Sequence, residues 1–189
     1  MLFTMILGNQ VAVSRNNQID TLSSWGKHFI VEADITVNSF NGPGWKNIIH
    51  FTTGKYVTDW NWNKIEKNLF LCTGGNAHNT IPGSRIPSIW AGTHGNKEKL
   101  LVVSSIGNNA NYHKVFEFSK GTKSHLLIHQ YHHCDGKDYF EILVDNMSVF
   151  KSENTNAVDV SNVKLYASDP WFHTFDGKLE NLAYYNQGK

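Results

Sequence analysis

Apolar and polar residues alternate with a period of two along most of this chain. Residues 28–37 show the pattern most clearly, since one parity is entirely apolar and the other is mainly polar. The apolar set is Phe29, Val31, Ala33, Ile35 and Val37. Side chains of a β-strand point alternately to its two faces, so this segment is predicted to be a strand with one buried face.

Similar runs follow at intervals, separated by turn signals such as Asn41-Gly42-Pro43-Gly44, Cys134-Asp135-Gly136 and Asp176-Gly177. They cover residues 48–52, 85–90, 100–106, 115–118, 125–133, 139–145, 147–151, 160–167 and 178–185, and the apolar start of the chain, residues 1–8, is expected to be a first strand. Residues 63–71 alone have a helical pattern, of two turns at most. Many short strands predict an all-β antiparallel sandwich or barrel, and residues 1–189 are expected to form one domain because no linker or repeat interrupts them.

Three segments carry a family resemblance. Residues 139–149 contain the hairpin Tyr139-Phe140-Glu141-Ile142-Leu143-Val144-Asp145-Asn146, residues 176–186 are similar to a closing strand, and residues 29–37 with 47–53 are similar to paired early strands. In this order they resemble the concanavalin A-like lectin/glucanase superfamily, which includes laminin-G-like domains, pentraxins and legume lectins. The resemblance covers residues 28–186 and implies a two-sheet jelly-roll sandwich. Asn146 replaces the usual turn glycine, which a type I′ turn tolerates because asparagine accepts a positive φ.

The charge balance excludes some function classes. With 17 basic and 16 acidic side chains the net charge is +1, so no clustered positive field favours nucleic acid or an anionic membrane. No apolar run reaches the ~20 residues of a membrane helix. Residues 1–8 lack the basic start and cleavage site of a signal peptide, so the protein is either cytoplasmic or secreted with a signal peptide that precedes this sequence, and the sequon Asn146-Met147-Ser148 favours secretion. Cys72 and Cys134 could form one disulfide or remain two free thiols.

Enzyme activity is not expected. Glucanases of the superfamily carry a Glu-x-Asp-x-x-Glu strand, and the similar segment here is Glu32-Ala33-Asp34-Ile35-Thr36-Val37. Glu32 and Asp34 share a strand face, but Val37 stands at the third acidic position and points the other way. A glycosidase needs a second positioned carboxyl group, so solvent-facing carboxylates are the preferred interpretation.

The histidines suggest a metal site only with help from other strands. His125, His129 and His133 share one strand face with Leu127 and Tyr131, whereas His132 takes the other. At ~3.3 Å per residue, His125 and His129 stand ~13 Å apart, too far for one zinc ion. A zinc site would need partners from adjacent strands, and an exposed polar face is the preferred interpretation.

Two predicted loops have the composition of a sugar-binding site. Aromatic rings pack on the apolar faces of sugars, while amides, carboxylates and guanidinium groups bond their hydroxyl edges, because an unpaired polar group costs ~1–3 kcal/mol. The first loop, residues 56–63, supplies Asp59, Trp60 and Trp62, and the second, residues 74–85, supplies Asn76, His78, Asn79 and Arg85. An ion pair that only stabilises the fold is an alternative role for Arg85.

A calcium site is a further expectation. Asp169 precedes a proline that holds it extended, and with Asn108 and Asn111 it could supply some of the six to eight oxygens that Ca²⁺ requires. The resemblance implies calcium because many members of the superfamily use it.

The leading hypothesis is therefore a secreted lectin that binds glycans without covalent chemistry, with calcium assistance. A homodimer would add avidity to weak sites. An extracellular protein-interaction or adhesion module of the laminin-G-like type is the alternative, and a β-glucan hydrolase is the third reading.

Overall fold

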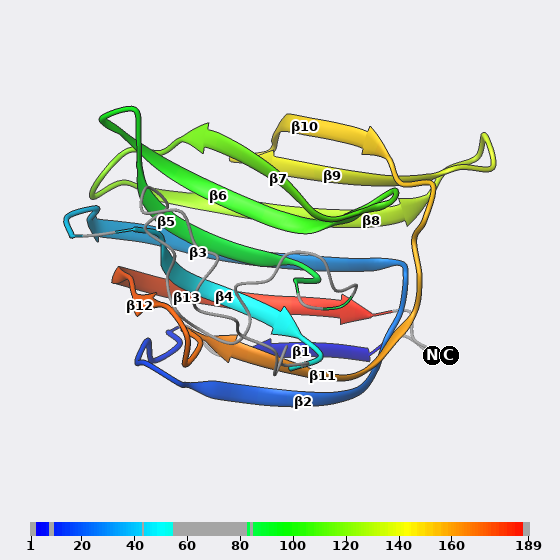
Figure 1. Ribbon diagram of the computed structural model, residues 1–189, viewed down its shortest axis with the longest axis horizontal. Coiled ribbons are helices and arrows are strands. Elements are labelled where there is room, and N and C mark those ends of the chain that lie inside the picture. Colours follow the sequence, from blue (N-terminus) through cyan, green and yellow to red (C-terminus); the bar gives the residue numbers. More distant parts are fainter. Residues whose placement is uncertain (1–2, 8–9, 43, 55–82, 84, 187–189) are drawn as a thin grey trace, which may run out of the picture.

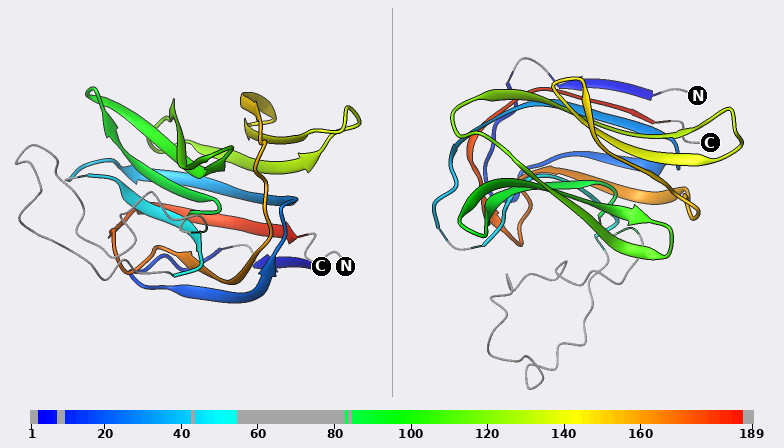
Figure 2. Two further views of the ribbon diagram at one scale, coloured as in Figure 1. Left: turned by 45° about the vertical axis from the view of Figure 1, so that its right-hand side comes forward. Right: turned by 90° about the horizontal axis from the view of Figure 1, so that it is seen from above.

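The computed structural model describes residues 3–7, 10–42, 44–54, 83 and 85–186. Its strands form two antiparallel sheets that face each other (Figures 1 and 2). The six-stranded sheet has the order β1 (Phe3–Leu7), β13 (Asp176–Asn186), β3 (Phe29–Ser39), β8 (Lys123–His132), β9 (Asp138–Val144) and β10 (Met147–Glu153). The seven-stranded sheet has the order β2 (Gln18–Trp25), β11 (Val160–Ala167), β4 (Lys46–Thr52), β5 (Ser88–His94), β6 (Lys97–Ile106) and β7 (Asn109–Glu117), and the short β12 (His173–Thr174) pairs with β4 in parallel. The predicted all-β sandwich is confirmed.

The core lies between the sheets and follows the predicted alternation. In β3, every residue of the apolar parity from Phe29 to Val37 is buried, and the other parity is partly exposed. Facing side chains come from the other sheet, where Phe51 and Leu165 are fully buried. Trp25 closes one end of this core, with its ring centroid 4.6 Å from that of Phe51. Burial of large apolar side chains, at roughly 1.5–3 kcal/mol each, is what holds the two layers together.

Strand β4 is buried on both faces. All seven of its residues are buried, although Asn47 and His50 are polar. One face contacts the main core, and the other lies beside a second apolar cluster that contains Trp90, Val103 and Phe172. Buried polar side chains need hydrogen-bond partners, and His50 Nδ1 has one in Asp169 Oδ2 at 2.6 Å.

The turn between β9 and β10 has the expected geometry. Asp145 and Asn146 have φ angles of 50° and 65°. Two central residues with positive φ are what a two-residue type I′ hairpin requires. Asparagine at the usual glycine position is therefore compatible with the tight turn, as the sequence predicts.

Several strands differ from the prediction, and the largest differences are in β2, β7 and β5. The sequence does not predict β2, because residues 18–25 are mostly polar and do not alternate. This strand is defined by its pairing with β11. β7 begins at Asn109 rather than at residue 115, since its polar first half pairs with β6. β5 begins at Ser88 rather than at Arg85. The predicted helical stretch at residues 63–71 lies outside the described residues.

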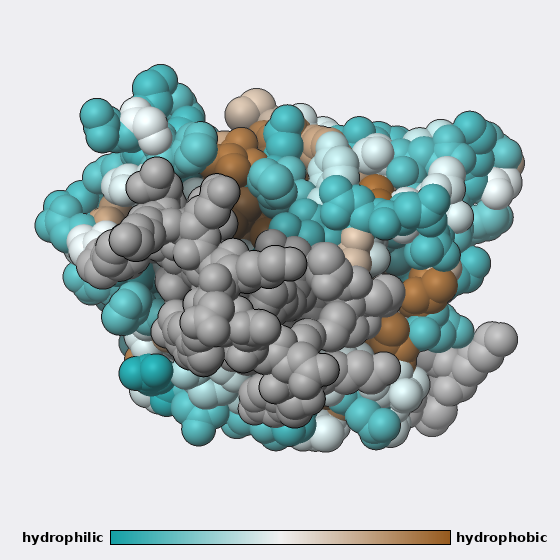
Figure 3. Space-filling view, viewed as in Figure 1, coloured by the Kyte–Doolittle hydropathy of each residue, from teal (hydrophilic) through white to brown (hydrophobic). Residues whose placement is uncertain are grey.

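The surface of the described part is mainly polar, and no helix in it is long and apolar enough to cross a membrane. Figure 3 shows hydrophilic residues at the left and right ends of the face in view, with apolar residues near β6 and β7. Cys134 is exposed and carries a free thiol, and Cys72 lies outside the described residues.

Candidate functional site

The two sequence-predicted sugar-binding loops lie almost entirely outside the described residues. This holds for six candidates, Asp59, Trp60, Trp62, Asn76, His78 and Asn79, whose role stays a prediction. Arg85 is described, and it is buried with 8% of its surface exposed. Its Nη1 donates to Asn111 Oδ1 at 2.6 Å, and its guanidinium lies 4.9 Å from the ring centroid of Trp90.

Burial affects the protonation of Arg85. Desolvation lowers the pKa of its guanidinium to about 10, and the nearby carboxylate of Asp169 opposes the shift. The side chain therefore remains charged at neutral pH. These contacts fix Arg85 against Trp90 and Asn111, and its role in ligand binding stays a prediction.

The proposed calcium ligand Asp169 is fully buried beneath the turn that it begins. Its Oδ2 accepts a hydrogen bond from His50 Nδ1 at 2.6 Å. Its Oδ1 accepts the backbone N–H groups of Trp171 at 3.0 Å and Phe172 at 2.8 Å. A calcium ion would have to displace these donors, because the same oxygen lone pairs would coordinate it.

The two asparagines proposed with Asp169 lie in and beyond the turn between β6 and β7. Asn108 is exposed there, and Asn111 Oδ1 is occupied by Arg85. A cationic guanidinium among the proposed ligands disfavours a second cation at short range. Calcium binding through Asp169, Asn108 and Asn111 stays a prediction, and the energetic role of Asp169 is a direct test of it.

The described part also contains a groove of about 230 Å³ on the six-stranded sheet, where β8 and β13 end and β3 begins. It is lined by His28, Phe29, Ile30, His129, Gln130, Tyr131, His132 and Tyr185. The strand register explains this set, since Ile30 pairs with His129 on one side and with Tyr185 on the other. Three neighbouring strands thus place aromatic and polar side chains in one row.

Aromatic rings with nearby hydrogen-bonding groups line this groove. The rings of His129 and Tyr131 stack with centroids 4.4 Å apart and an interplanar angle of 29°. Tyr131 Oη donates to Glu141 Oε2 at 3.2 Å, and Tyr185 Oη donates to Glu32 Oε1 at 3.3 Å. These carboxylates hold the phenol groups in place and can accept further hydrogen bonds.

Two ionisable groups of the groove, His129 and Tyr185, have shifted pKa values that favour their neutral forms. Burial lowers the pKa of His129, so its imidazole is uncharged at neutral pH. The negative charge of Glu32, with some burial, raises the pKa of Tyr185 and keeps its phenol protonated. A neutral imidazole and a phenol each both donate and accept a hydrogen bond, which matches the hydroxyl groups of a sugar.

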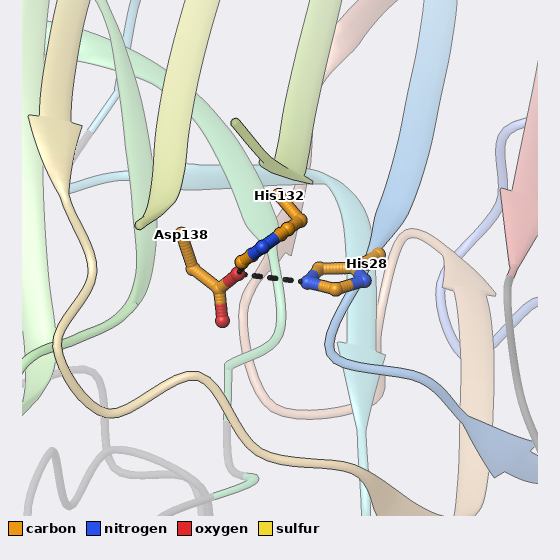
Figure 4. Close-up of side chains that lie close together, drawn as sticks. All are labelled: His28, His132 and Asp138. Atoms are coloured by element: carbon orange, nitrogen blue, oxygen red, sulfur yellow. Dashed lines mark hydrogen bonds and ion pairs between the residues drawn. The ribbon is translucent and has the colours of Figure 1, made fainter. Parts of the chain in front are cut away.

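Beside the groove, two histidines converge on one carboxylate (Figure 4). His28 Nε2 lies 3.0 Å and His132 Nδ1 lies 2.8 Å from the same oxygen, Asp138 Oδ1. Lys27 Nζ lies 3.2 Å from the other oxygen, Oδ2. Burial alone would raise the pKa of Asp138, but hydrogen bonds from His132, His28 and Lys27 lower it to about 2. His28 and His132 also line the groove.

Comparison with known proteins identifies the fold. No protein-family model matches the sequence, and comparison with curated proteins found no match. Among solved structures, the chain is similar to a native heptameric SAP-like pentraxin from Limulus polyphemus, with 12% identity and a TM-score of 0.51 over 95% of this chain and 75% of the pentraxin chain. The chain has the concanavalin A-like fold. The receptor-binding domain of botulinum neurotoxin D is also similar, with 9% identity and a TM-score of 0.50 over 100% of this chain and 45% of that chain.

Alternation along β8 explains which histidines share a face. His125, Leu127, His129 and Tyr131 are all partly exposed on the outer face of β8, as the alternation predicts, and His133 is partly exposed just after the end of the strand. The convergence of His28 and His132 on Asp138 was not predicted. His132 has the other parity, and only the pairing of β8 with β9 and β3 brings its partners close.

Glu32 and Asp34, the two acidic residues that resemble part of the glucanase motif, both contact His125. His125 bridges Glu32 and Asp34, with Nδ1 2.9 Å from Asp34 Oδ1 and Nε2 3.8 Å from Glu32 Oε2. Asn181 Nδ2 donates to Asp34 Oδ2 at 2.8 Å. Val37 is buried and points inward, as predicted. The absence of catalysis stays a prediction.

Proposed function

We propose that this domain is an extracellular lectin that binds a glycan in the groove formed by β3, β8 and β13. The observation that carries the proposal is the composition of the groove: His129, Tyr131 and Tyr185 surround a cavity of about 230 Å³ with hydrogen-bonding groups on its walls. A volume of this size is just below the range of small-molecule sites and accommodates one sugar unit.

Physical chemistry supports a sugar rather than a charged ligand. The rings supply apolar surface for the C–H faces of a pyranose, and the neutral imidazole and phenol bond its hydroxyl groups. Glu32 and Glu141 hold the two phenols and Lys151 Nζ lies 5.4 Å from the centroid of the Tyr131 ring, so charges of both signs adjoin the groove and neither favours an ion of one sign. A neutral sugar is therefore the ligand class that fits this groove.

The test is a glycan array with the full chain, in the presence and absence of EDTA, followed by calorimetric titration of the best ligand. Tyr131→Ala and His129→Ala are expected to weaken binding by roughly tenfold or more each, which corresponds to about 1.4 kcal/mol. His113→Ala is the matched control, because His113 is exposed on β7 of the other sheet and should leave the affinity unchanged.

The predicted loop site is tested in the same experiment. Trp60→Ala or Trp62→Ala would abolish binding if the glycan sits on residues 55–63, and the groove variants would then bind normally. Loss of binding in the groove variants alone supports the groove. Failure of every glycan to bind, together with capture by an extracellular protein, would replace the lectin proposal with an adhesion module.

A further inference from the structure

We propose that His28, His132 and Asp138 form a binding site for a zinc ion. Each residue offers one ligand atom, and the three atoms lie within 4.8 Å of one another. No other set of three histidine, cysteine or carboxylate ligands converges in this way in the part of the chain that the structure describes. His28 and His132 also line the groove, but the zinc-binding experiment below uses no sugar, so its outcome is distinct from that of the lectin proposal.

The spacing of the ligand atoms is close to that of a zinc coordination shell. Zinc binds imidazole nitrogen and carboxylate oxygen at ~2.0–2.2 Å, so neighbouring ligands of a tetrahedral ion stand about 3.3 Å apart. The two nitrogens stand 3.0 Å and 2.8 Å from Asp138 Oδ1, at hydrogen-bond separation. An ion that replaces the bridging protons lengthens these two separations by only a few tenths of an ångström, and the two nitrogens, which lie within 4.8 Å of each other, must take up the same spacing.

The fold holds these ligands on separate, paired strands. His132 ends β8 and is the direct cross-strand partner of Asp138, the first residue of β9. His28 immediately precedes β3, where the backbone of Lys27 is fixed: its N–H donates to Asp159 Oδ1 at 2.8 Å, and its carbonyl accepts from the side chain of Gln130. Little conformational entropy is therefore lost when the three ligands bind one ion.

The cluster is open on one side. The His28 and Asp138 side chains are 21% and 14% exposed, whereas that of His132 is 56% exposed. Two ligands are thus anchored against the protein and the third faces solvent. This arrangement leaves an entry path for the ion and a coordination position for water or an exogenous ligand, as in three-ligand zinc sites.

The donor set selects the metal. Two imidazole nitrogens and one carboxylate suit zinc and its transition-metal neighbours, whereas calcium requires six to eight oxygen ligands. We therefore expect Zn²⁺ to bind and Ca²⁺ to be ineffective at this site, even at millimolar concentration.

Lys27 provides a sensitive diagnostic. Its ammonium group lies 3.2 Å from Asp138 Oδ2, and its side chain is 44% exposed. A positive charge at this place repels a metal ion bound to Oδ1, so Lys27→Ala is expected to tighten zinc binding by about 3–10-fold. A variant that only damaged the fold would weaken binding instead.

The experiment uses the full chain, freed of any polyhistidine tag and stripped with EDTA, in competition with a chromophoric zinc chelator. One equivalent of Zn²⁺ should bind, and Co²⁺ should give the intense visible absorption of a tetrahedral site. His132→Ala and Asp138→Asn are each expected to reduce the affinity about 100-fold or more, because even residues that only support metal ligands cost 10–100-fold.

His125→Ala is the matched control. His125 also contacts two carboxylates, but through its two different nitrogens, which cannot bind the same ion. Its removal should leave the zinc affinity unchanged. Circular dichroism shows whether each variant is folded, and the exposed His132 makes its variant the least disruptive. Absence of zinc binding to the folded wild-type chain, or affinity that His132→Ala and Asp138→Asn leave unchanged, overturns the proposal.

Discussion

Replacement of Asp169 by alanine tests whether this residue stabilises the fold directly or through calcium. The carboxylate is fully buried and accepts three hydrogen bonds, from His50 and from the backbone of Trp171 and Phe172. Removal of the carboxylate leaves these donors unpaired in the interior. A buried donor without a partner costs about 1–3 kcal/mol, and three donors lose their acceptor here.

We therefore expect Asp169→Ala to lower the free energy of unfolding by about 3–5 kcal/mol. For a chain of this size, 1 kcal/mol corresponds to about 2–4 °C in Tm, so the midpoint should fall by about 6–20 °C. Asp169→Asn keeps one oxygen that can accept the backbone N–H groups and should lose about half as much. Asp176→Ala is the control, since Asp176 is exposed at the start of β13 and should change stability by less than about 0.5 kcal/mol.

The assay is urea denaturation of each protein, in EDTA and in millimolar calcium. An ion that binds only the folded state at 100 times its dissociation constant adds about 2.7 kcal/mol. If the hydrogen bonds are what matters, the effect of Asp169→Ala is the same in both buffers. A wild-type stability that rises with calcium, and a rise that Asp169→Ala abolishes, would refute this reasoning and support the calcium site.

Two further predictions concern the same sandwich. Gly177→Ala should destabilise the domain by about 1–3 kcal/mol in the same urea assay. The reason is that a Cβ at this position would lie 2.1 Å from the backbone oxygen of Thr36 and 2.5 Å from the ring of Phe175. A Gly177→Ala protein as stable as the wild type would contradict this prediction. The pKa of Asp34 should lie below 3.8, since burial would raise it but hydrogen bonds from His125 and Asn181 lower it. The contribution of Asp34 to stability is thus present above pH ~4 and is lost as pH falls further, and NMR titration should show the pKa rising in His125→Ala. An Asp34 pKa that His125→Ala leaves unchanged would disprove that assignment.

Local pattern determined much of the architecture. Alternation places Phe29 to Val37 on the buried face of β3, and the predicted bounds of residues 160–167 match β11. The Asp145-Asn146 turn also follows from the sequence, because few residue pairs tolerate positive φ at both positions. These features depend on neighbours within a few residues, which a single sequence displays.

Tertiary structure alone decided which distant residues meet. β2 has no apolar alternation, so its place depends on hydrogen bonds to β11, more than 130 positions away in the chain. The sequence suggests that Asp169 is a calcium ligand. Its buried partner His50 lies 119 residues earlier in the chain, and local sequence does not reveal a contact over that separation. The cluster of His28, His132 and Asp138 requires the register of three strands, and a shift of one residue in any of them would separate its ligands. Alternation along a strand fixes the face on which a side chain lies, whereas the pairing between strands fixes its neighbours.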